Sequence, residues 1–139
     1  MIINKIKLDN IRSYNQKEIH FSLGSTLLSG DIGSGKSTVL LAIDFALFGL
    51  SKGIITGEAL LRHGQKEGSV ELNFSIDNND ITIRRTLKRS GSSINQDSGY
   101  LKINDNLENL SPVELKQRVL EILNYPQETL TKKSLIYRY

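Results

Sequence analysis

The clearest pattern in the chain lies between positions 70 and 76, where valine, leucine, phenylalanine and isoleucine alternate with polar residues. A period of two predicts a strand with one buried face. After a polar turn at residues 77–80, residues 81–87 return to the same kind of alternation. The sequence therefore predicts an antiparallel hairpin in this part of the chain.

Shorter apolar runs predict further strands, and polar stretches predict the connections between them. The predicted strands are residues 2–8, 18–22, 25–29 and 100–107. The predicted turns and loops are residues 10–16, the glycine-punctuated residues 51–68, and the serine-rich residues 90–99. We expect the last of these to be a polar, flexible loop.

Two segments have the pattern of helices. Residues 36–48 are apolar on almost every side, so we expect this helix to be central to the core and to end at Gly49. The second helix begins with Ser111-Pro112-Val113-Glu114, where the serine caps the helix, the proline suits its first position and the glutamate completes a capping box. Pro126 marks its exit. Residues 134–139 turn apolar again, as if the chain stopped inside an element.

Composition narrows the class of protein. A length of 139 residues with 38% hydrophobic residues suits one domain with a core. The absence of cysteine excludes a disulfide framework and cysteine-ligated zinc in this stretch. The charged N-terminus lacks a signal-peptide core, and the longest apolar run, residues 39–50, is too short to span a bilayer. We therefore expect a soluble, intracellular protein with no membrane partner.

The candidate chemistry is concentrated in Gly30-Asp31-Ile32-Gly33-Ser34-Gly35-Lys36-Ser37-Thr38, which matches the phosphate-binding pattern G-x-x-x-x-G-K-[ST]. The glycines let the backbone curl, so that successive N–H groups point into one concavity. The helix that follows adds its positive N-terminal end. We expect Lys36 to reach the β- and γ-phosphates of ATP and the Ser37 hydroxyl to ligate Mg²⁺.

Other segments resemble one family of P-loop proteins. Leu8-Asp9-Asn10-Ile11-Arg12-Ser13-Tyr14 is similar to the "NFRSH" segment near the start of SMC-like ATPases, and residues 37–49 resemble their "SSLLEAIxFALFG" helix. Residues 57–64 resemble their "LIRxG" segment, and residues 70–85 resemble their strand pair. The resemblance covers most of residues 1–90. It is strongest to the double-strand-break repair ATPase of the SMC/RecN/SbcC group, which works with a nuclease partner.

The resemblance implies a fold and a set of site residues. The implied fold is α/β: residues 1–139 would form the N-terminal part of an ABC-type, P-loop ATPase head, with an antiparallel sheet beside the nucleotide site. Arg12 and Ser13 would approach the phosphates of the nucleotide. The phosphate-binding motif would wrap the phosphates, through Gly30, Ile32, Gly33, Ser34, Gly35, Lys36, Ser37 and Thr38. Leu61, Arg62 and His63 would lie near the base and the sugar.

One departure from the family concerns Ile32, where asparagine is usual. The backbone N–H remains, so phosphate cradling should survive while a side-chain contact is lost. The chain also has no "LSGG"-like signature and no apolar strand ending in Asp-Glu after the P-loop. We therefore expect the nucleotide-cradling half of a split head, with no catalytic residue in this chain.

The resemblance also implies partners. In the family, ATP and Mg²⁺ join two heads, which implies a second copy of the head, together with a repair nuclease and double-stranded DNA ends. The implied location is cytoplasmic, on the nucleoid, or nuclear in a eukaryote. The absence of cysteine does not argue against a Cys-x-x-Cys zinc hook, because the coiled-coil segment that would carry one is not in this chain.

Three interpretations stay open. The first is the repair ATPase head, and the second is a chromosome organiser of the SMC type or a RecF-like DNA-binding ATPase with the same head. The third is a small P-loop kinase or GTPase. Asn4-Lys5-Ile6-Lys7 lacks the aspartate of a guanine-reading motif, and Arg84-Arg85 falls on a predicted strand rather than in a kinase lid. Both observations disfavour the third interpretation.

A basic cluster, Arg84, Arg85, Lys88 and Arg89, has no acidic residue near it in the sequence. A charged strand end is its commoner explanation, and contact with DNA phosphates is the alternative. His20 falls in a strand pattern, for which we expect a structural role. The acids Asp44, Glu58, Glu67 and Glu71 occur singly in the sequence, and no catalytic pair of carboxylates is evident among them.

The missing catalytic parts generate a first prediction. The isolated 139-residue chain is expected to show no steady-state ATP hydrolysis that depends on Lys36, because phosphoryl transfer to water needs groups that the chain lacks. A phosphate-release assay on the chain and on its Lys36→Ala variant would measure this. Turnover by the unchanged chain that disappears in the variant would contradict the prediction.

Overall fold

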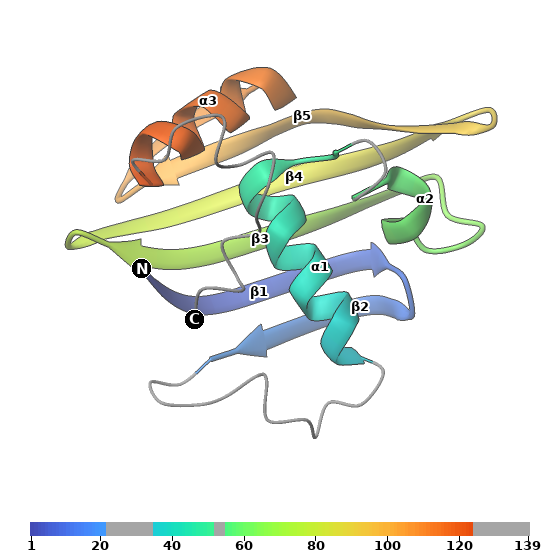
Figure 1. Ribbon diagram of the computed structural model, residues 1–139, viewed down its shortest axis with the longest axis horizontal. Coiled ribbons are helices and arrows are strands. Elements are labelled where there is room, and N and C mark those ends of the chain that lie inside the picture. Colours follow the sequence, from blue (N-terminus) through green and yellow to red (C-terminus); the bar gives the residue numbers. More distant parts are fainter. Residues whose placement is uncertain (22–34, 52–54, 124–139) are drawn as a thin grey trace.

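The computed structural model describes residues 1–21, 35–51 and 55–123. The described strands are β1 (Ile2–Ile11), β2 (Tyr14–His20), β3 (Glu67–Ile76), β4 (Asn79–Ser90), β5 (Ser93–Ile103) and β6 (Asn106–Leu110). The described helices are α1 (Gly35–Phe48), α2 (Gly57–Leu60) and α3 (Pro112–Leu123). Figure 1 shows their arrangement.

The strands form one antiparallel sheet in the order β2-β1-β3-β4-β5-β6. Strand β1 pairs with β2 as a hairpin, and β3, β4, β5 and β6 pair in succession as hairpins. The long-range pairing of β1 with β3 joins the first hairpin to the rest. In that pairing Ile6 lies opposite Leu72, and Leu8 lies opposite Val70. These four side chains are buried, so the alternation of each strand directs its apolar residues to the same face.

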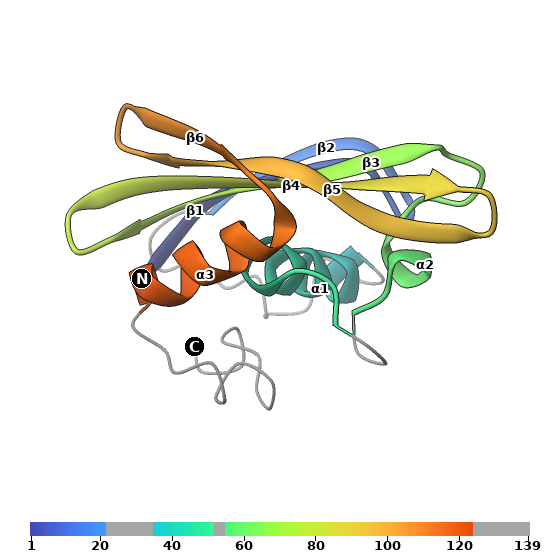
Figure 2. The same cartoon turned by 90° about the horizontal axis from the view of Figure 1, so that it is seen from above.

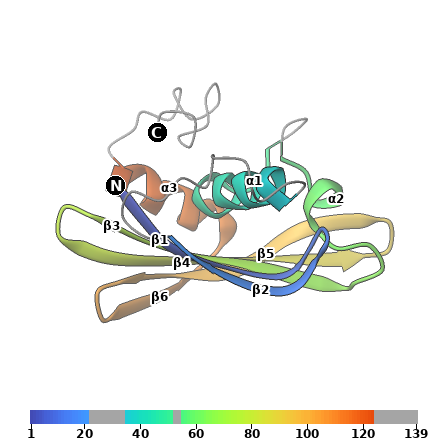
Figure 3. The ribbon, with the colours of Figure 1, turned by 90° about the horizontal axis from the view of Figure 1, so that it is seen from below.

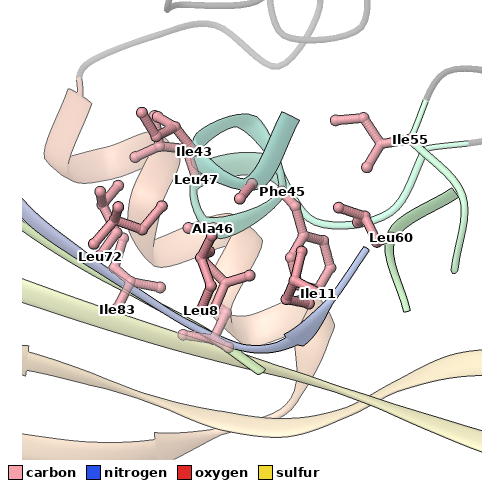
Figure 4. Close-up of a cluster of buried hydrophobic side chains, with 14 of the residues drawn as sticks. Leu8, Ile11, Ile43, Phe45, Ala46, Leu47, Ile55, Leu60, Leu72 and Ile83 are labelled. Carbon is pink, nitrogen blue, oxygen red and sulfur yellow. The ribbon is translucent and has the colours of Figure 1, made fainter. Parts of the chain in front are cut away.

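Helices α1 and α3 cover that face and leave the other face of the sheet uncovered by described helices (Figures 2 and 3). Helix α1 crosses the sheet and packs on β1, β3 and β4. Its residues Ile43, Phe45 and Leu47 are almost completely buried, above the side chains of the sheet (Figure 4). The prediction that this helix is central to the core is confirmed.

The C-terminal end of α1 is closed by Gly49 and Arg85. Gly49 has a φ of 79°, which favours glycine, and its N–H donates to the Phe45 carbonyl at 2.8 Å. Arg85 is only 1% exposed, and its Nε and Nη2 donate to the carbonyls of Ala46 and Leu47 at 2.8 and 3.2 Å. A cation at this position also complements the negative end of the helix.

Burial lowers the pKa of Arg85 to about 10, so the guanidinium remains charged at neutral pH. Its Nη1 donates to Gln96 Oε1 on β5 at 3.3 Å, which ties the helix end to a second strand. The basic cluster expected from the sequence is therefore divided. Arg85 lies in the core, while Lys88 pairs with Asp97 across the sheet at 2.9 Å.

The prediction of a flexible loop at residues 90–99 is wrong, because most of this stretch belongs to β5. The chain turns tightly between β4 and β5, and Gly91 in this turn has a φ of 62°. Leu87 then pairs with Gln96, and Arg89 pairs with Ile94, which is 7% exposed. Pairing with β4 and the burial of one face outweigh the low strand propensity of a serine-rich composition.

Other boundaries differ in smaller ways. The predicted turn at residues 10–16 is shorter, because β1 runs to Ile11 and β2 begins at Tyr14. The predicted loop at residues 51–68 contains the one-turn helix α2 and the start of β3.

The capping box is confirmed: the Ser111 N–H donates to Glu114 Oε1 at 2.9 Å, and the Glu114 N–H donates to Ser111 Oγ at 3.3 Å. The bond from the Ser111 N–H to the carboxylate lowers the pKa of Glu114. The predicted strand 25–29, Pro126 and residues 134–139 lie outside the described residues.

The role of Arg85 generates a second prediction. Arg85→Met is expected to lower the free energy of unfolding by about 3 kcal/mol, because it removes hydrogen bonds to buried carbonyls that then lack partners. Urea denaturation followed by far-UV circular dichroism would measure the loss. Arg84→Met is the matched control, because the neighbouring Arg84 is exposed and should lose less than about 1 kcal/mol. Equal losses in the two variants would contradict the assignment.

Candidate nucleotide site

The first turn of α1 carries the end of the phosphate-binding motif. The helix begins at Gly35, as the motif requires, and Ser37 is exposed while Thr38 is buried. The N-terminus of a helix of 14 residues offers free N–H groups and the positive end of its dipole to an anion. Gly30, Ile32, Gly33 and Ser34 lie outside the described residues, and so does the side chain of Lys36.

The turn between β1 and β2 consists of Arg12 and Ser13, which are both exposed. Arg12 has a φ of 51°, and Asn10 has a φ of 53°. These left-handed conformations are uncommon outside glycine, although asparagine adopts them more readily than arginine does. Between them, Ile11 is completely buried and lies beneath Phe45 in the core (Figure 4). The core therefore anchors a sharply bent chain that presents Arg12 and Ser13 at the surface.

The segment after α2 lies against this turn. The Arg12 N–H donates to the Leu60 carbonyl at 2.8 Å, and the Arg62 N–H donates to the Asn10 carbonyl at 2.9 Å. In addition, Arg62 Nη1 donates to the Arg12 carbonyl at 3.2 Å. Residues about fifty positions apart in the sequence are thereby held side by side through their backbones.

This arrangement brings together two of the three groups of residues that the sequence points to. Arg12, Ser13 and His63 have exposed side chains, Arg62 is half-buried, and Leu61 is 5% exposed. Ser37 and Thr38 lie on α1, and no described hydrogen bond or ion pair joins them to the other two groups. Contact of any of these residues with a nucleotide stays a prediction.

Sequence reasoning missed two residues that hold the turn in place. Asn10 Nδ2 donates to the Glu67 carbonyl at the start of β3, at 3.1 Å. Gly68 leaves no room for a side chain, because a Cβ there would lie 2.8 Å from the carbonyl oxygens of Asp9 and Asn10. The residue types carried a signal, since asparagine tolerates left-handed backbone and glycine in a strand often marks a close approach.

The opposite face of the sheet carries a row of alternating charges. Lys7 on β1 lies 3.6 Å from Glu18 on β2 and 3.8 Å from Glu71 on β3, and Arg84 on β4 faces Glu71 in the register. A hydrogen bond with His20, at 2.8 Å, lowers the pKa of Glu18. Tyr100 on β5 donates to Glu71 and continues the row.

These charges surround a shallow depression of about 450 Å³. Its lining contains equal numbers of acidic and basic side chains: Lys7, Lys17, Arg84, Asp9, Glu18 and Glu71. Because opposite charges are interleaved, the described residues that line this depression present no concentration of positive charge that would attract a polyanion.

Two features are absent from the part of the chain that the structure describes. No described helix is long and apolar enough to cross a membrane. No described group of three or more acidic or histidine side chains is placed to hold a metal ion. The assignment of Ser37 to Mg²⁺ stays a prediction from the motif.

The packing of Gly68 generates a third prediction. Gly68→Ala is expected to lower the free energy of unfolding by about 2–3 kcal/mol, because the added methyl group collides with the backbone of β1. Gly91→Ala is the control: Gly91 is left-handed, but a Cβ there meets no atom within 4 Å, so only about 1 kcal/mol should be lost. Chemical denaturation would compare the two, and an equal or smaller loss for Gly68→Ala would contradict the close approach.

Comparison with known proteins places this fold and motif in a family. The family model described as an AAA domain matches residues 5–137. The "DNA double-strand break repair Rad50 ATPase" of Thermoplasma volcanium is 38% identical over 98 residues, which are 70% of this chain and 11% of that protein. The protein of the same name from Thermoplasma acidophilum is 34% identical over 134 residues, covering 96% of this chain and 14% of the relative.

A solved structure of the recombination mediator protein RecF-ATP in the RecFOR pathway shares the fold, with a TM-score of 0.58. It is 24% identical, and the match covers 81% of this chain and 30% of that chain. The present chain therefore spans about a tenth to a seventh of the length of the curated relatives above. The motif, the fold and the match to the family model show that the chain belongs to the AAA domain family, and the chain is similar to a part of the Rad50 ATPases named above.

Proposed function

We propose that this chain is the ATP-binding segment of an ATPase that acts in DNA double-strand-break repair. The observation that carries the proposal is the sequence G-x-x-x-x-G-K-S, whose last residues form the first turn of α1. The relatives named as double-strand-break repair ATPases support the choice of process. In the full-length protein, residues 1–139 would be the first half of a split head.

The described part of the site fits a nucleotide phosphate group. A helix N-terminus with an exposed serine hydroxyl in its first turn suits an anion and its metal ion, and exposed Arg12 adds a second positive group. Bound Mg²⁺ would neutralise phosphate charge during phosphoryl transfer to water. The residues of this chain would bind and orient: Lys36 would lie at the β- and γ-phosphates, Ser37 at the metal, and Arg12 and Ser13 would reach the phosphates from the turn between β1 and β2.

Completion of the site would require groups from outside this chain. We propose that a second copy of the head closes over bound ATP, and that closing and reopening move a nuclease partner on double-stranded DNA ends. Such a role would place the protein in the cytoplasm, or in the nucleus if the source is a eukaryote. The likeness of the fold to RecF keeps a RecF-like DNA-binding ATPase as the alternative.

Loss of the P-loop lysine provides the fourth prediction. Lys36→Ala in the full-length protein is expected to weaken ATP binding at least about 100-fold, because a charge that contacts two phosphates is removed. Titration calorimetry would measure the affinity, with an unchanged far-UV circular dichroism spectrum as the check on folding. Lys66→Ala is the matched control, since Lys66 is an exposed lysine in a loop.

Three outcomes would contradict the proposal. Unchanged ATP affinity in Lys36→Ala would remove the phosphate-binding role of the motif. Loss of folding in that variant would make the lysine structural. Displacement of ATP by equimolar GTP in the unchanged protein would favour a different class of P-loop protein.

A further inference from the structure

The peptide that joins Arg12 to Ser13 is held by a side chain from another segment. Arg12 has a left-handed φ of 51°, a conformation that an arginine does not favour by itself. Its carbonyl accepts the 3.2 Å hydrogen bond from Arg62 Nη1. The strained residue and the bond to it occur at the same place, so the bond helps to maintain the conformation.

Planarity of the peptide extends the effect of this bond. The Arg12 carbonyl and the Ser13 N–H belong to one trans peptide unit and point in opposite directions. A guanidinium that holds the carbonyl therefore also fixes the direction of the Ser13 N–H. The backbone of Arg62 is itself fixed, since its N–H donates to the Asn10 carbonyl at 2.9 Å. The half-buried side chain thus acts from a rigid base.

We propose that Arg62 is a positioning residue of the nucleotide site, acting through the Arg12–Ser13 turn. Its guanidinium keeps Arg12 in the left-handed conformation, and the turn in this shape presents Arg12 and Ser13 to the phosphates of ATP. The inference rests on the proposed function, because it assumes that the turn faces a nucleotide. It differs from a direct contact of Arg62 with the base or sugar, which the sequence resemblance implies.

A double-mutant cycle with two ligands tests the inference in the full-length protein. Arg62→Met is expected to weaken binding about tenfold, as expected for the loss of a hydrogen bond from a charged donor. The loss should be similar for ATP and for inorganic tripolyphosphate, because tripolyphosphate has phosphates without a base or sugar. In an Arg12→Ala background, Arg62→Met should cause less than about a threefold further loss, since the Arg12 side chain is gone and only Ser13 remains to be positioned.

Arg89→Met is the matched control. Arg89 Nε donates to the Gln65 carbonyl at 3.0 Å, so the variant also removes an arginine-to-carbonyl bond in the same region but leaves Arg12 untouched. It should bind both ligands normally. If Arg62→Met fails to fold, Arg62→Lys, which keeps the charge but replaces the planar guanidinium by a single ammonium group, enters the same cycle in its place.

The outcomes separate the two roles. A loss confined to ATP, an equal loss in the Arg12→Ala background, or no loss at all would overturn the positioning role. A full-length protein whose ATP affinity is unaffected by Lys36→Ala would instead overturn the proposed nucleotide site, and the inference with it. Similar losses for both ligands that fall below about threefold in the Arg12→Ala background would support the inference.

Discussion

The enclosure of α1 is the constraint on which the rest of the structure depends. A helix without a polar face has to be covered, and the antiparallel sheet covers it through the apolar faces of β1, β3 and β4. Its orientation is then fixed at its far end by the buried Arg85 and the left-handed Gly49. The N-terminal end of α1, which carries the last residues of the phosphate-binding motif, is thereby positioned in part by contacts at the opposite end of the helix.

Strand β1 connects this core to the second part of the site. Ile6 and Leu8 belong to the cluster beneath α1, and three residues later the buried Ile11 anchors the turn. The predicted site residues Ser37 and Arg12 thus lie on or next to two elements, α1 and β1, that pack together in the core. Each exposed side chain is only a few residues away from a buried one. Such a site gains its precision from the sheet rather than from its loops.

Local patterns predicted the parts of the fold that local physics determines. The alternation in β3 and β4, the apolar helix α1 and the capping box at Ser111 depend on neighbours in the sequence, and all three were confirmed. Strand β5 was missed because its stability comes from pairing with β4, which a serine-rich composition does not reveal. Arg85 was assigned to a surface cluster for a similar reason, since its partners are carbonyls at the end of a helix.

In the candidate site, too, the sequence identified some residues but not the contacts between them. The motif identified the start of α1, and the family resemblance marked Arg12 and the segment at Leu61. That these two segments bond to each other could not be predicted, because the bonds run between backbone groups and a guanidinium across the fold. Backbone hydrogen bonds leave little trace in the types of residues that make them.

The interleaved charges on the open face of the sheet have a consequence for ionic conditions. Binding to a polyanion becomes sensitive to salt in proportion to the counterions that unpaired cations displace from it. Lys7 already has two carboxylates within 4 Å, so it has little counterion-releasing capacity to offer. A steep salt dependence in the binding of a polyanion to this chain would therefore report on cations other than Lys7.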